Sequence, residues 1–139
     1  MGNAFYGNNG NSDARRSLVD FYANQRGKYD LNELRDLKWQ NLDGTQKEID
    51  RVSKLFGTKK IFTKKSASET NLKASNSRQE LSNYKYLLFA AHGHFMPYAP
   101  AFSSIVLSQG VDTKEDGYVT IGEWMGLDLN SDVVFFFGV

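Results

Sequence analysis

Residues 86–95, Tyr-Leu-Leu-Phe-Ala-Ala-His-Gly-His-Phe, constrain the fold of this chain more than any other segment. Every residue from Leu87 to Ala91 is apolar, which is typical of a strand covered on both faces of a parallel sheet. Open α/β sheets place their ligands beyond the carboxyl ends of such strands. His92 stands at that end, and Gly93 would let the backbone turn sharply close to a ligand. The segment therefore predicts a buried strand that presents His92 as a candidate general base.

A second apolar run, Val133 to Phe137, follows Asp132 and predicts another buried strand. Strand patterns alternate with helical patterns along the chain, which favours a layered α/β fold with a mainly parallel sheet. Thr45 with Glu48 and Ser66 with Glu69 have the spacing of capping boxes, which predicts a helix start at each. The other expected elements are helices over residues 14–25, 45–56 and 67–74, and strands over residues 4–6, 60–63, 103–107 and 118–121.

The apolar run at Val133 to Phe137 lies at the very end of the sequence. Such a strand belongs inside a sheet, so we expect these residues to be the amino-terminal half of a larger domain. We also expect the isolated chain to expose this strand and to self-associate or aggregate through it. The aromatic residues Trp39, Trp124 and Phe135 to Phe137 are interpreted most simply as core.

Composition limits the classes of function that remain open. The 139 residues correspond to one domain, and a net charge of +1 gives no reason to expect a nucleic-acid or membrane partner. The chain has no cysteine, which excludes disulfides, thiolate metal sites and a cysteine nucleophile within these residues. With two histidines and no evident cluster of carboxylates, we expect no metal or other cofactor. No apolar run reaches about 18 residues, so we expect a cytoplasmic protein.

His92 has a functional interpretation and a simpler one. A lone histidine at a strand end most often forms only local hydrogen bonds. A catalytic histidine needs a nucleophile, and Ser103 and Ser104 are the nearest candidates, although no strained turn marks either as activated. Of the two histidines around Gly93, we expect only one to face a site, and we favour His92 over His94.

Residues 112–123 partly match a calcium-binding loop. Asp112, Asp116 and Glu123 occupy the first, fifth and twelfth places, and Gly117 occupies the sixth. However, Lys114 stands at a ligand position, and the preceding residues are typical of a strand where a helix is required. We therefore favour an Asp-Gly turn between two strands.

Several short segments stand in an order that is specific as a set. They are Gly2-Asn3; Leu42-Asp43-Gly44-Thr45 followed by Lys47-Glu48-Ile49; Leu55-Phe56-Gly57; Ala67 to Lys73; Tyr86 to Gly93; Pro100 to Leu107; Asp116 to Thr120 with Glu123; Leu127-Asp128-Leu129; and Asp132-Val133-Val134. Together they resemble the CHAT domain family, caspase-like domains related to caspases and separases. The resemblance spans nearly the whole chain and implies a partial CHAT domain over residues 1–139, with a caspase-like three-layer α/β/α fold.

The resemblance also implies a site. In the family, the histidine of an Ala-x-His-Gly strand end and a cysteine at the end of the next core strand form a catalytic dyad, which implies that His92 is the general base. The amide of Gly93 would help to bind the oxyanion. The family's cysteine position is occupied by Val139, so peptidase chemistry by this polypeptide alone is not expected.

Two hypotheses about function follow from the resemblance. In the first, the chain is the amino-terminal half of a cysteine endopeptidase that acts on a protein or peptide, and its partner is the missing carboxy-terminal half or a second copy bound through the last strand. In the second, it is a non-catalytic interaction remnant, a pseudo-peptidase. A small-molecule-binding α/β domain would need a phosphate-cradling turn, and the Gly7-Asn8-Asn9-Gly10 loop matches one poorly.

Overall fold

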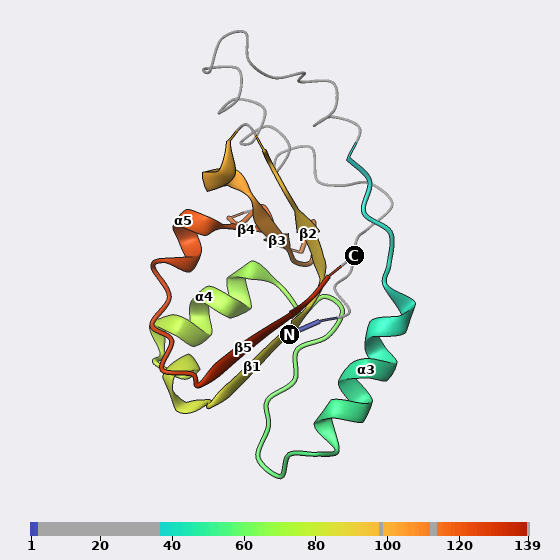
Figure 1. Cartoon of the computed structure of the whole chain (residues 1–139), viewed down its shortest axis with the longest axis vertical. Helices are drawn as coiled ribbons and strands as arrows, with labels where there is room; N and C mark the ends of the chain where they lie inside the picture. Colours follow the sequence, from blue (N-terminus) through green and yellow to red (C-terminus); the bar gives the residue numbers. More distant parts are fainter. Residues whose placement is uncertain (3–36, 98, 112–113, 139) are drawn as a thin grey trace, which may run out of the picture.

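The computed structural model describes residues 1–2, 37–97, 99–111 and 114–138. These residues form a mixture of helices and strands with a small parallel sheet, in agreement with the expected α/β class (Figure 1). The elements are α3 (Asp43–Ser53), α4 (Glu69–Ser77), the 3₁₀ helix η1 (Leu81–Asn83), β1 (Tyr86–Ala90), β2 (His92–His94), the 3₁₀ helix η2 (Pro100–Phe102), β3 (Ser104–Val106), β4 (Tyr118–Thr120), α5 (Ile121–Trp124) and β5 (Val133–Phe137). The strand expected over residues 4–6 and the helix expected over residues 14–25 lie outside the described residues.

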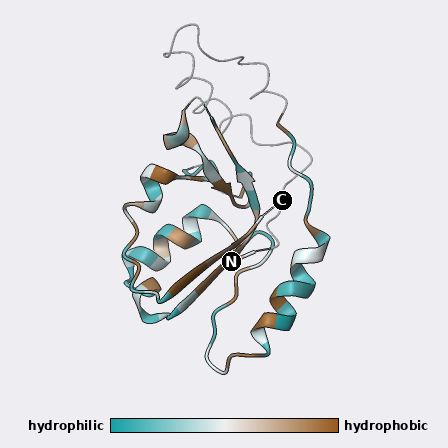
Figure 2. Cartoon of the chain, in the orientation of Figure 1, coloured by the Kyte–Doolittle hydropathy of each residue, from teal (hydrophilic) through white to brown (hydrophobic). Residues whose placement is uncertain are grey.

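The two strands with the most apolar sequences, β1 and β5, pair with each other in parallel. The register sets Tyr86 opposite Val133 and Ala90 opposite Phe137. On the other edge of β1, Gly2 forms a parallel bridge with Ala90. Figure 2 shows the hydrophobic colour concentrated along this pair of strands, as the sequence predicts.

The remaining strands form a separate antiparallel sheet in the order β2-β3-β4. Its register sets His92 opposite Val106, and Val106 in turn opposite Tyr118. The expectation of a mainly parallel sheet therefore holds for β1 and β5 but not for these three strands. The reason is the length of the connections. Short loops join β2 to β3 and β3 to β4, and a short loop can connect neighbouring strands only in antiparallel fashion. By contrast, a long crossover separates β1 from β5, which allows them to pair in parallel.

Two helix starts and one strand differ from the sequence-based expectation. Helix α3 begins at Asp43, and the hydroxyl of Thr45 donates to the Leu42 carbonyl 2.7 Å away instead of capping the helix. Helix α4 is capped by Ser68, whose hydroxyl accepts from Asn71 N, rather than by Ser66. Residues 60–63 form no strand. Several Ser and Thr residues near a helix start satisfy the same spacing rule, so local sequence alone does not choose between them.

The core lies between β1 and helix α4. Leu72 and Leu81 pack with Phe89, Ala91, Leu107 and Val119, and Trp124 packs against this cluster. On the opposite face of β1, Ala90 meets Gly2, and the ring of Tyr86 lies 5.5 Å from the ring of Phe56 beyond the end of α3. The expectation that Phe135 to Phe137 are core is wrong, because their exposed fractions are 43%, 51% and 49%. Among the described strands, β1 is the one that pairs with β5.

Gly117 is expected to be intolerant of a side chain. Its φ of +84° lies in the left-handed region, and an added Cβ would lie 2.6 Å from Nε2 of Gln109 and 3.0 Å from the Ser108 carbonyl oxygen. Gly117→Ala should lower the free energy of unfolding by about 1–3 kcal/mol. Gly44→Ala in α3 is the matched control, because a Cβ there meets nothing within 4 Å, and it should raise stability by ~0.5 kcal/mol. Urea unfolding of both variants measures the difference, and equal effects would contradict the strain at Gly117.

Candidate functional site

The carboxyl ends of β1 and β5 meet at the point where the chain continues into β2. The Ala91 amide donates to the Phe137 carbonyl at 3.0 Å, which holds the end of β5 against this corner. A Cβ added at Gly138 would lie 2.9 Å from the Ala91 carbonyl oxygen and 3.5 Å from the Gly93 nitrogen. The backbone at the end of β5 therefore runs directly beside the His92-Gly93 step, and glycine at position 138 allows this close approach.

His92 is held by contacts with the segment that precedes α3. Its Nε2 lies 2.7 Å from the Gln40 carbonyl oxygen, and its ring centroid lies 5.2 Å from that of Trp39. Because a carbonyl oxygen only accepts hydrogen bonds, Nε2 carries the proton and donates it to Gln40. In the neutral ring, the proton-accepting nitrogen is then Nδ1. The contact with Gln40 thus fixes both the tautomer and the orientation of His92.

The second histidine, His94, lies on the same side of β2 as His92. The rings of Trp39 and His94 are 5.8 Å apart, and the indole nitrogen of Trp39 donates to the Tyr118 hydroxyl at 2.8 Å. Burial lowers the pKa of His94 below its usual value. The expectation that only one histidine faces this side is wrong, because residues two apart in a strand project from the same face. Trp39 contacts both rings.

Gly93 does not make the sharp turn that its residue type suggested. It lies within β2 opposite Ile105, and its φ is not positive. A Cβ at this position would meet nothing within 4 Å. The backbone therefore continues as extended chain past His92, and the Gly93 amide lies next to the end of β5.

The candidate nucleophiles are not brought to the His92 ring in the described part of the chain. The Ser103 hydroxyl accepts from the Met96 amide at 3.0 Å. Ser104 is buried and lies opposite His94, not opposite His92. Val139, which stands at the family's cysteine position, lies outside the described residues, as does Asp112 of the calcium-like segment.

The predicted Asp-Gly turn before a strand is confirmed. Oδ1 of Asp116 accepts from the Tyr118 amide at 2.8 Å, and Gly117 leads into β4. Glu123, at the last ligand position of the calcium-like pattern, instead completes a capping box with Thr120 at the start of α5. The calcium-like spacing is thus explained by a turn and a helix cap.

Away from the histidines, Lys73 of α4 joins three carboxylates. Its Nζ lies 2.7 Å from Glu69, 2.6 Å from Glu115 and 2.8 Å from Glu123. The carboxylate oxygens lie within 4.8 Å of one another, and the lysine ammonium supplies the positive charge between them. Glu69 also accepts from the Gly117 amide at 2.8 Å. This Lys73 network ties α4 to β4 and α5, and sequence reasoning missed it because its members are up to 54 positions apart.

The pKa values within the Lys73 network follow from burial and from the shared ammonium. Burial raises the pKa of Glu69 to about 8. Burial opposes the charge on Lys73, but the hydrogen bonds to Glu115, Glu123 and Glu69 outweigh it and raise the pKa of Lys73. Burial also opposes the charge on Glu123, yet hydrogen bonds from Lys73 and Thr120 lower its pKa overall. One lysine faces three carboxylates, and the most deeply buried carboxyl, Glu69, is the one that holds its proton.

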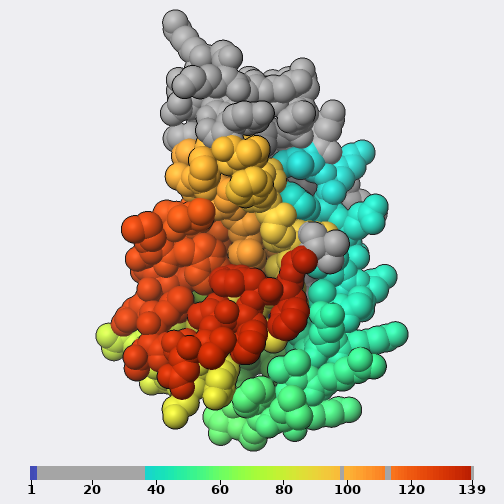
Figure 3. Space-filling model, viewed as in Figure 1, coloured from blue at the N-terminus to red at the C-terminus, as the bar shows by residue number. Residues whose placement is uncertain are grey.

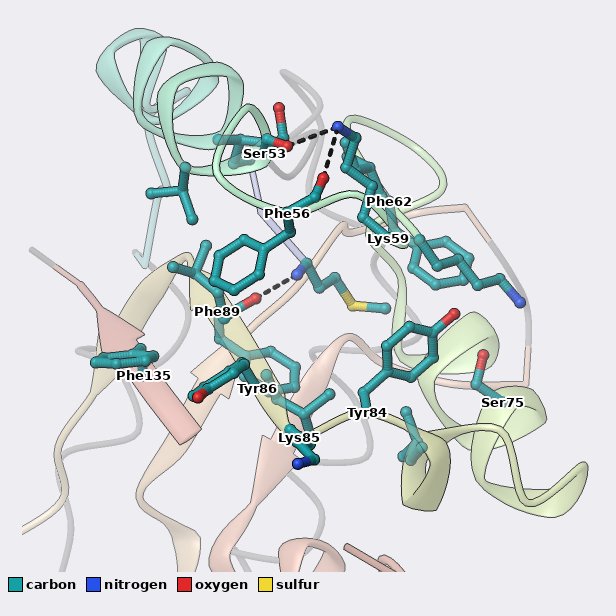
Figure 4. A pocket seen from close by; sticks show the side chains of 18 of the residues that line it. Ser53, Phe56, Lys59, Phe62, Ser75, Tyr84, Lys85, Tyr86, Phe89 and Phe135 are labelled. Carbon is teal, nitrogen blue, oxygen red and sulfur yellow. Dashed lines mark hydrogen bonds between the residues drawn. The ribbon is translucent and has the colours of Figure 1, made fainter. Parts of the chain in front are cut away.

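A groove of about 630 Å³ lies on the α3 side of β1 and does not include His92. Figure 4 shows Phe56, Tyr86 and Phe135 on one side of it and Tyr84 and Phe62 on the other. Its lining is largely apolar, with Lys59, Lys60 and Glu80 among its polar residues. The groove is therefore suited to apolar surface, and it is separate from the corner that holds His92.

A comparison with protein families identifies the chain. The family model described as the CHAT domain matches residues 5–137. This chain belongs to the CHAT domain family. No curated protein and no solved structure matches the chain. Each helix in the described ranges of this CHAT domain is too short or too polar to cross a membrane.

Within this CHAT domain, the sequence located the strand-end histidine but not the residues that hold it. Trp39 and the Gln40 carbonyl come from a stretch without clear periodicity, and a backbone carbonyl leaves no trace in the sequence. The only signal was the presence of Trp39 itself, because the leucines around it follow no clear period.

Proposed function

We propose that this chain is the histidine-bearing part of a caspase-like cysteine endopeptidase domain, with His92 as its general base. The observation that carries this proposal is the approach of the end of β5 to the His92-Gly93 step. A Cβ added at position 138 would lie 2.9 Å from the Ala91 carbonyl oxygen and 3.5 Å from the Gly93 nitrogen, so the end of β5 runs beside the residues that flank His92. Position 139 is where the family carries its cysteine.

The geometry supports distinct roles for His92 and Gly93. With Nε2 donating to Gln40, Nδ1 is the nitrogen that would take the thiol proton. The resulting thiolate would attack a peptide carbonyl, and the imidazolium would return the proton to the leaving amine. The Gly93 amide, beside the end of β5, would donate to the oxyanion.

The finer fold assignment is part of the same proposal. Helix α4 packs on the Phe89 face of β1, while Ile49 of α3 lies close to Gly2 beside the opposite face. Helices on both sides of a parallel strand pair support a three-layer α/β/α arrangement. We propose that residues 1–139 represent the amino-terminal half of such a domain.

A preparation of these 139 residues is expected to cleave no peptide, because the chain contains no cysteine and the acyl-enzyme cannot form. The assay is incubation with a mixed peptide library followed by mass spectrometry. Turnover that disappears in His92→Ala would contradict this expectation. The result tests activity, whereas the dyad geometry needs a separate experiment.

The geometry can be tested with one introduced thiol. Val139→Cys gives the chain a single cysteine, whose pKa is measured from the pH dependence of its alkylation by iodoacetamide. If His92 serves as its base, the thiol pKa should lie at least about one unit below that in Val139→Cys/His92→Ala. Asn130→Cys, at an exposed position, is the matched control and should not respond to His92→Ala. Equal pKa values for the 139 thiol with and without His92 would contradict the proposed dyad.

The second candidate function is that of a non-catalytic interaction module. The absence of cysteine and the apolar groove on the α3 side of β1 favour it. The thiol experiment separates the two, since an interaction module has no need to keep position 139 within reach of the His92 base.

A further inference from the structure

Trp39 joins the segment before α3 to the antiparallel β2-β3-β4 sheet. Its ring centroid lies 5.2 Å from that of His92 and 6.3 Å from that of Tyr118. Figure 3 shows this segment, in cyan, lying against the residues around β2. Residues 37–42 form neither helix nor strand, so no backbone ladder holds them on the sheet. Side chains must therefore help to hold the segment in place, and Trp39 is half-buried while the residues on either side of it are exposed.

The indole of Trp39 has a buried partner on the far strand of this sheet. Its nitrogen donates to the Tyr118 hydroxyl at 2.8 Å, and Tyr118 is 4% exposed in β4. The strand register sets Tyr118 opposite Val106, and Val106 opposite His92. Residues in register on neighbouring strands project from the same face of a sheet. Trp39 therefore lies over one row of residues, from His92 in β2 to Tyr118 in β4.

This anchor determines where the next residue, Gln40, places its carbonyl oxygen. That oxygen lies 2.7 Å from Nε2 of His92. Hydrogen bonds from N–H to oxygen fall between about 2.7 and 3.2 Å, so a displacement of about 1 Å would break this one. Because every residue type has a backbone carbonyl, the sequence can control this contact only through the side chains that hold the backbone there.

We propose that Trp39, anchored by Tyr118, is the positioning residue of His92. It holds the Gln40 carbonyl against Nε2, so that Nδ1 stays the proton-accepting nitrogen and the ring keeps one orientation. Trp39 acts through Gln40 and is not itself a catalytic residue. The consequence for peptide cleavage rests on the proposed function, whereas the effect on the His92 ring does not.

A ring at position 39 that served only for packing would need no polar atom. Trp39 also packs against the buried cluster of Ala67, Val106 and Tyr118, and a phenylalanine could make the same apolar contact. The N–H that donates to Tyr118 is what distinguishes the two roles. Removing this hydrogen bond while keeping both aromatic rings should leave the fold intact but release the Gln40 carbonyl.

The experiment measures how fast the Nε2 proton of His92 exchanges with water. The ¹⁵N-labelled chain is studied by NMR at about pH 7.5, above the ordinary pKa of histidine. Donation to Gln40 should slow the exchange in the unmodified chain. Tyr118→Phe and Trp39→Phe should each make it about fivefold faster, as expected for the loss of one ordinary hydrogen bond. The double variant should match the single variants, because both changes break the same contact.

Two matched controls separate this effect from a general loosening of the fold. Trp124→Phe changes the other tryptophan, which packs on Phe89 and Phe136. Tyr84→Phe removes a phenol hydroxyl from a residue that lines the groove on the α3 side of β1. Neither control should alter the exchange at His92. The amide spectrum of each variant shows that it is folded, and either single variant tests the proposal where the other fails to fold.

The proposal is overturned if the His92 proton exchanges equally fast in the unmodified chain and in the single variants. It is also overturned if the controls accelerate the exchange as much, or if the double variant exchanges much faster than either single variant.

A second readout separates this result from the proposed function. In Val139→Cys, Tyr118→Phe should shift the thiol pKa in the same direction as His92→Ala does. A thiol that responds to His92→Ala, together with an exchange rate that ignores Tyr118→Phe, would contradict the positioning role and leave the dyad standing. The reverse pair of results would contradict the dyad and leave the positioning role standing.

Discussion

Replacing Lys73 by methionine is expected to lower the free energy of unfolding by about 2–4 kcal/mol at pH 7. The variant leaves the ionised Glu115 and Glu123 beside the protonated Glu69, all within 4.8 Å of one another, without a cation between them. Breaking a fully buried ion pair by removing one partner costs about 3–5 kcal/mol. The expected loss is smaller, because the Lys73 side chain is 35% exposed and water screens part of the interaction.

Urea unfolding at several pH values measures this loss and identifies its cause. If repulsion between carboxylates is responsible, the destabilisation by Lys73→Met should shrink as the pH falls toward 4, where the carboxylates become protonated. Lys60→Met is the control. It removes another short lysine–glutamate contact, 2.6 Å from Glu80, but at a more exposed site, and should destabilise the chain clearly less than Lys73→Met does. Equal losses for the two variants would show that the three carboxylates do not depend on Lys73.

The second large effect is a loss of stability as the pH rises from about 5 to 8. The pKa of Glu69 is about 8 in the folded chain and 4.5 as a free side chain. Between these values, the folded state holds a proton that the unfolded state has released. Stability therefore falls with rising pH, by about 1 kcal/mol per unit from this group alone. Above pH 8 both states are ionised and the fall ends.

Glu69→Gln isolates this contribution, because glutamine keeps an oxygen for the Gly117 amide but does not titrate. The difference in unfolding free energy between the unmodified chain and Glu69→Gln should therefore change steadily between pH 5 and 8. Burial lowers the pKa of the Met1 amine to about 6, which acts with the opposite sign in this window, but that group is the same in both proteins and cancels. Glu123 has a lowered pKa, so its contribution is lost only below pH 4.5. A difference that does not vary with pH would show that Glu69 is ionised throughout.

Strands were easier to predict from the sequence than helix starts. The continuous apolar runs in the sequence predict strands at β1 and β5. The ends of both strands lie within one residue of the predicted positions. Helix starts depend on which of several nearby hydroxyls caps the first turn. At α4 the answer was Ser68 and not Ser66, because Ser68 is the one that reaches Asn71 N.

The exposure of β5 shows a different limit. Its sequence predicts burial on both faces, and its pairing with β1 was expected, yet Phe135 to Phe137 are about half exposed. An apolar sequence pattern indicates that the side chains of a strand are suited to burial. Whether those side chains are buried depends on which other strands and helices pack against them. Within the described residues, β5 is therefore where the sequence-based expectation and the structure disagree most.

By itself, the sequence determined the CHAT family, the α/β class and the strand that leads to His92, because runs of apolar residues and their order are written directly in the chain. Only the tertiary structure decided that Gln40 fixes the tautomer of His92, that the end of β5 lies beside Gly93, and that Lys73 joins three carboxylates. Each of these includes contacts between residues more than 40 positions apart, and such contacts are set by how the elements pack and not by any local pattern.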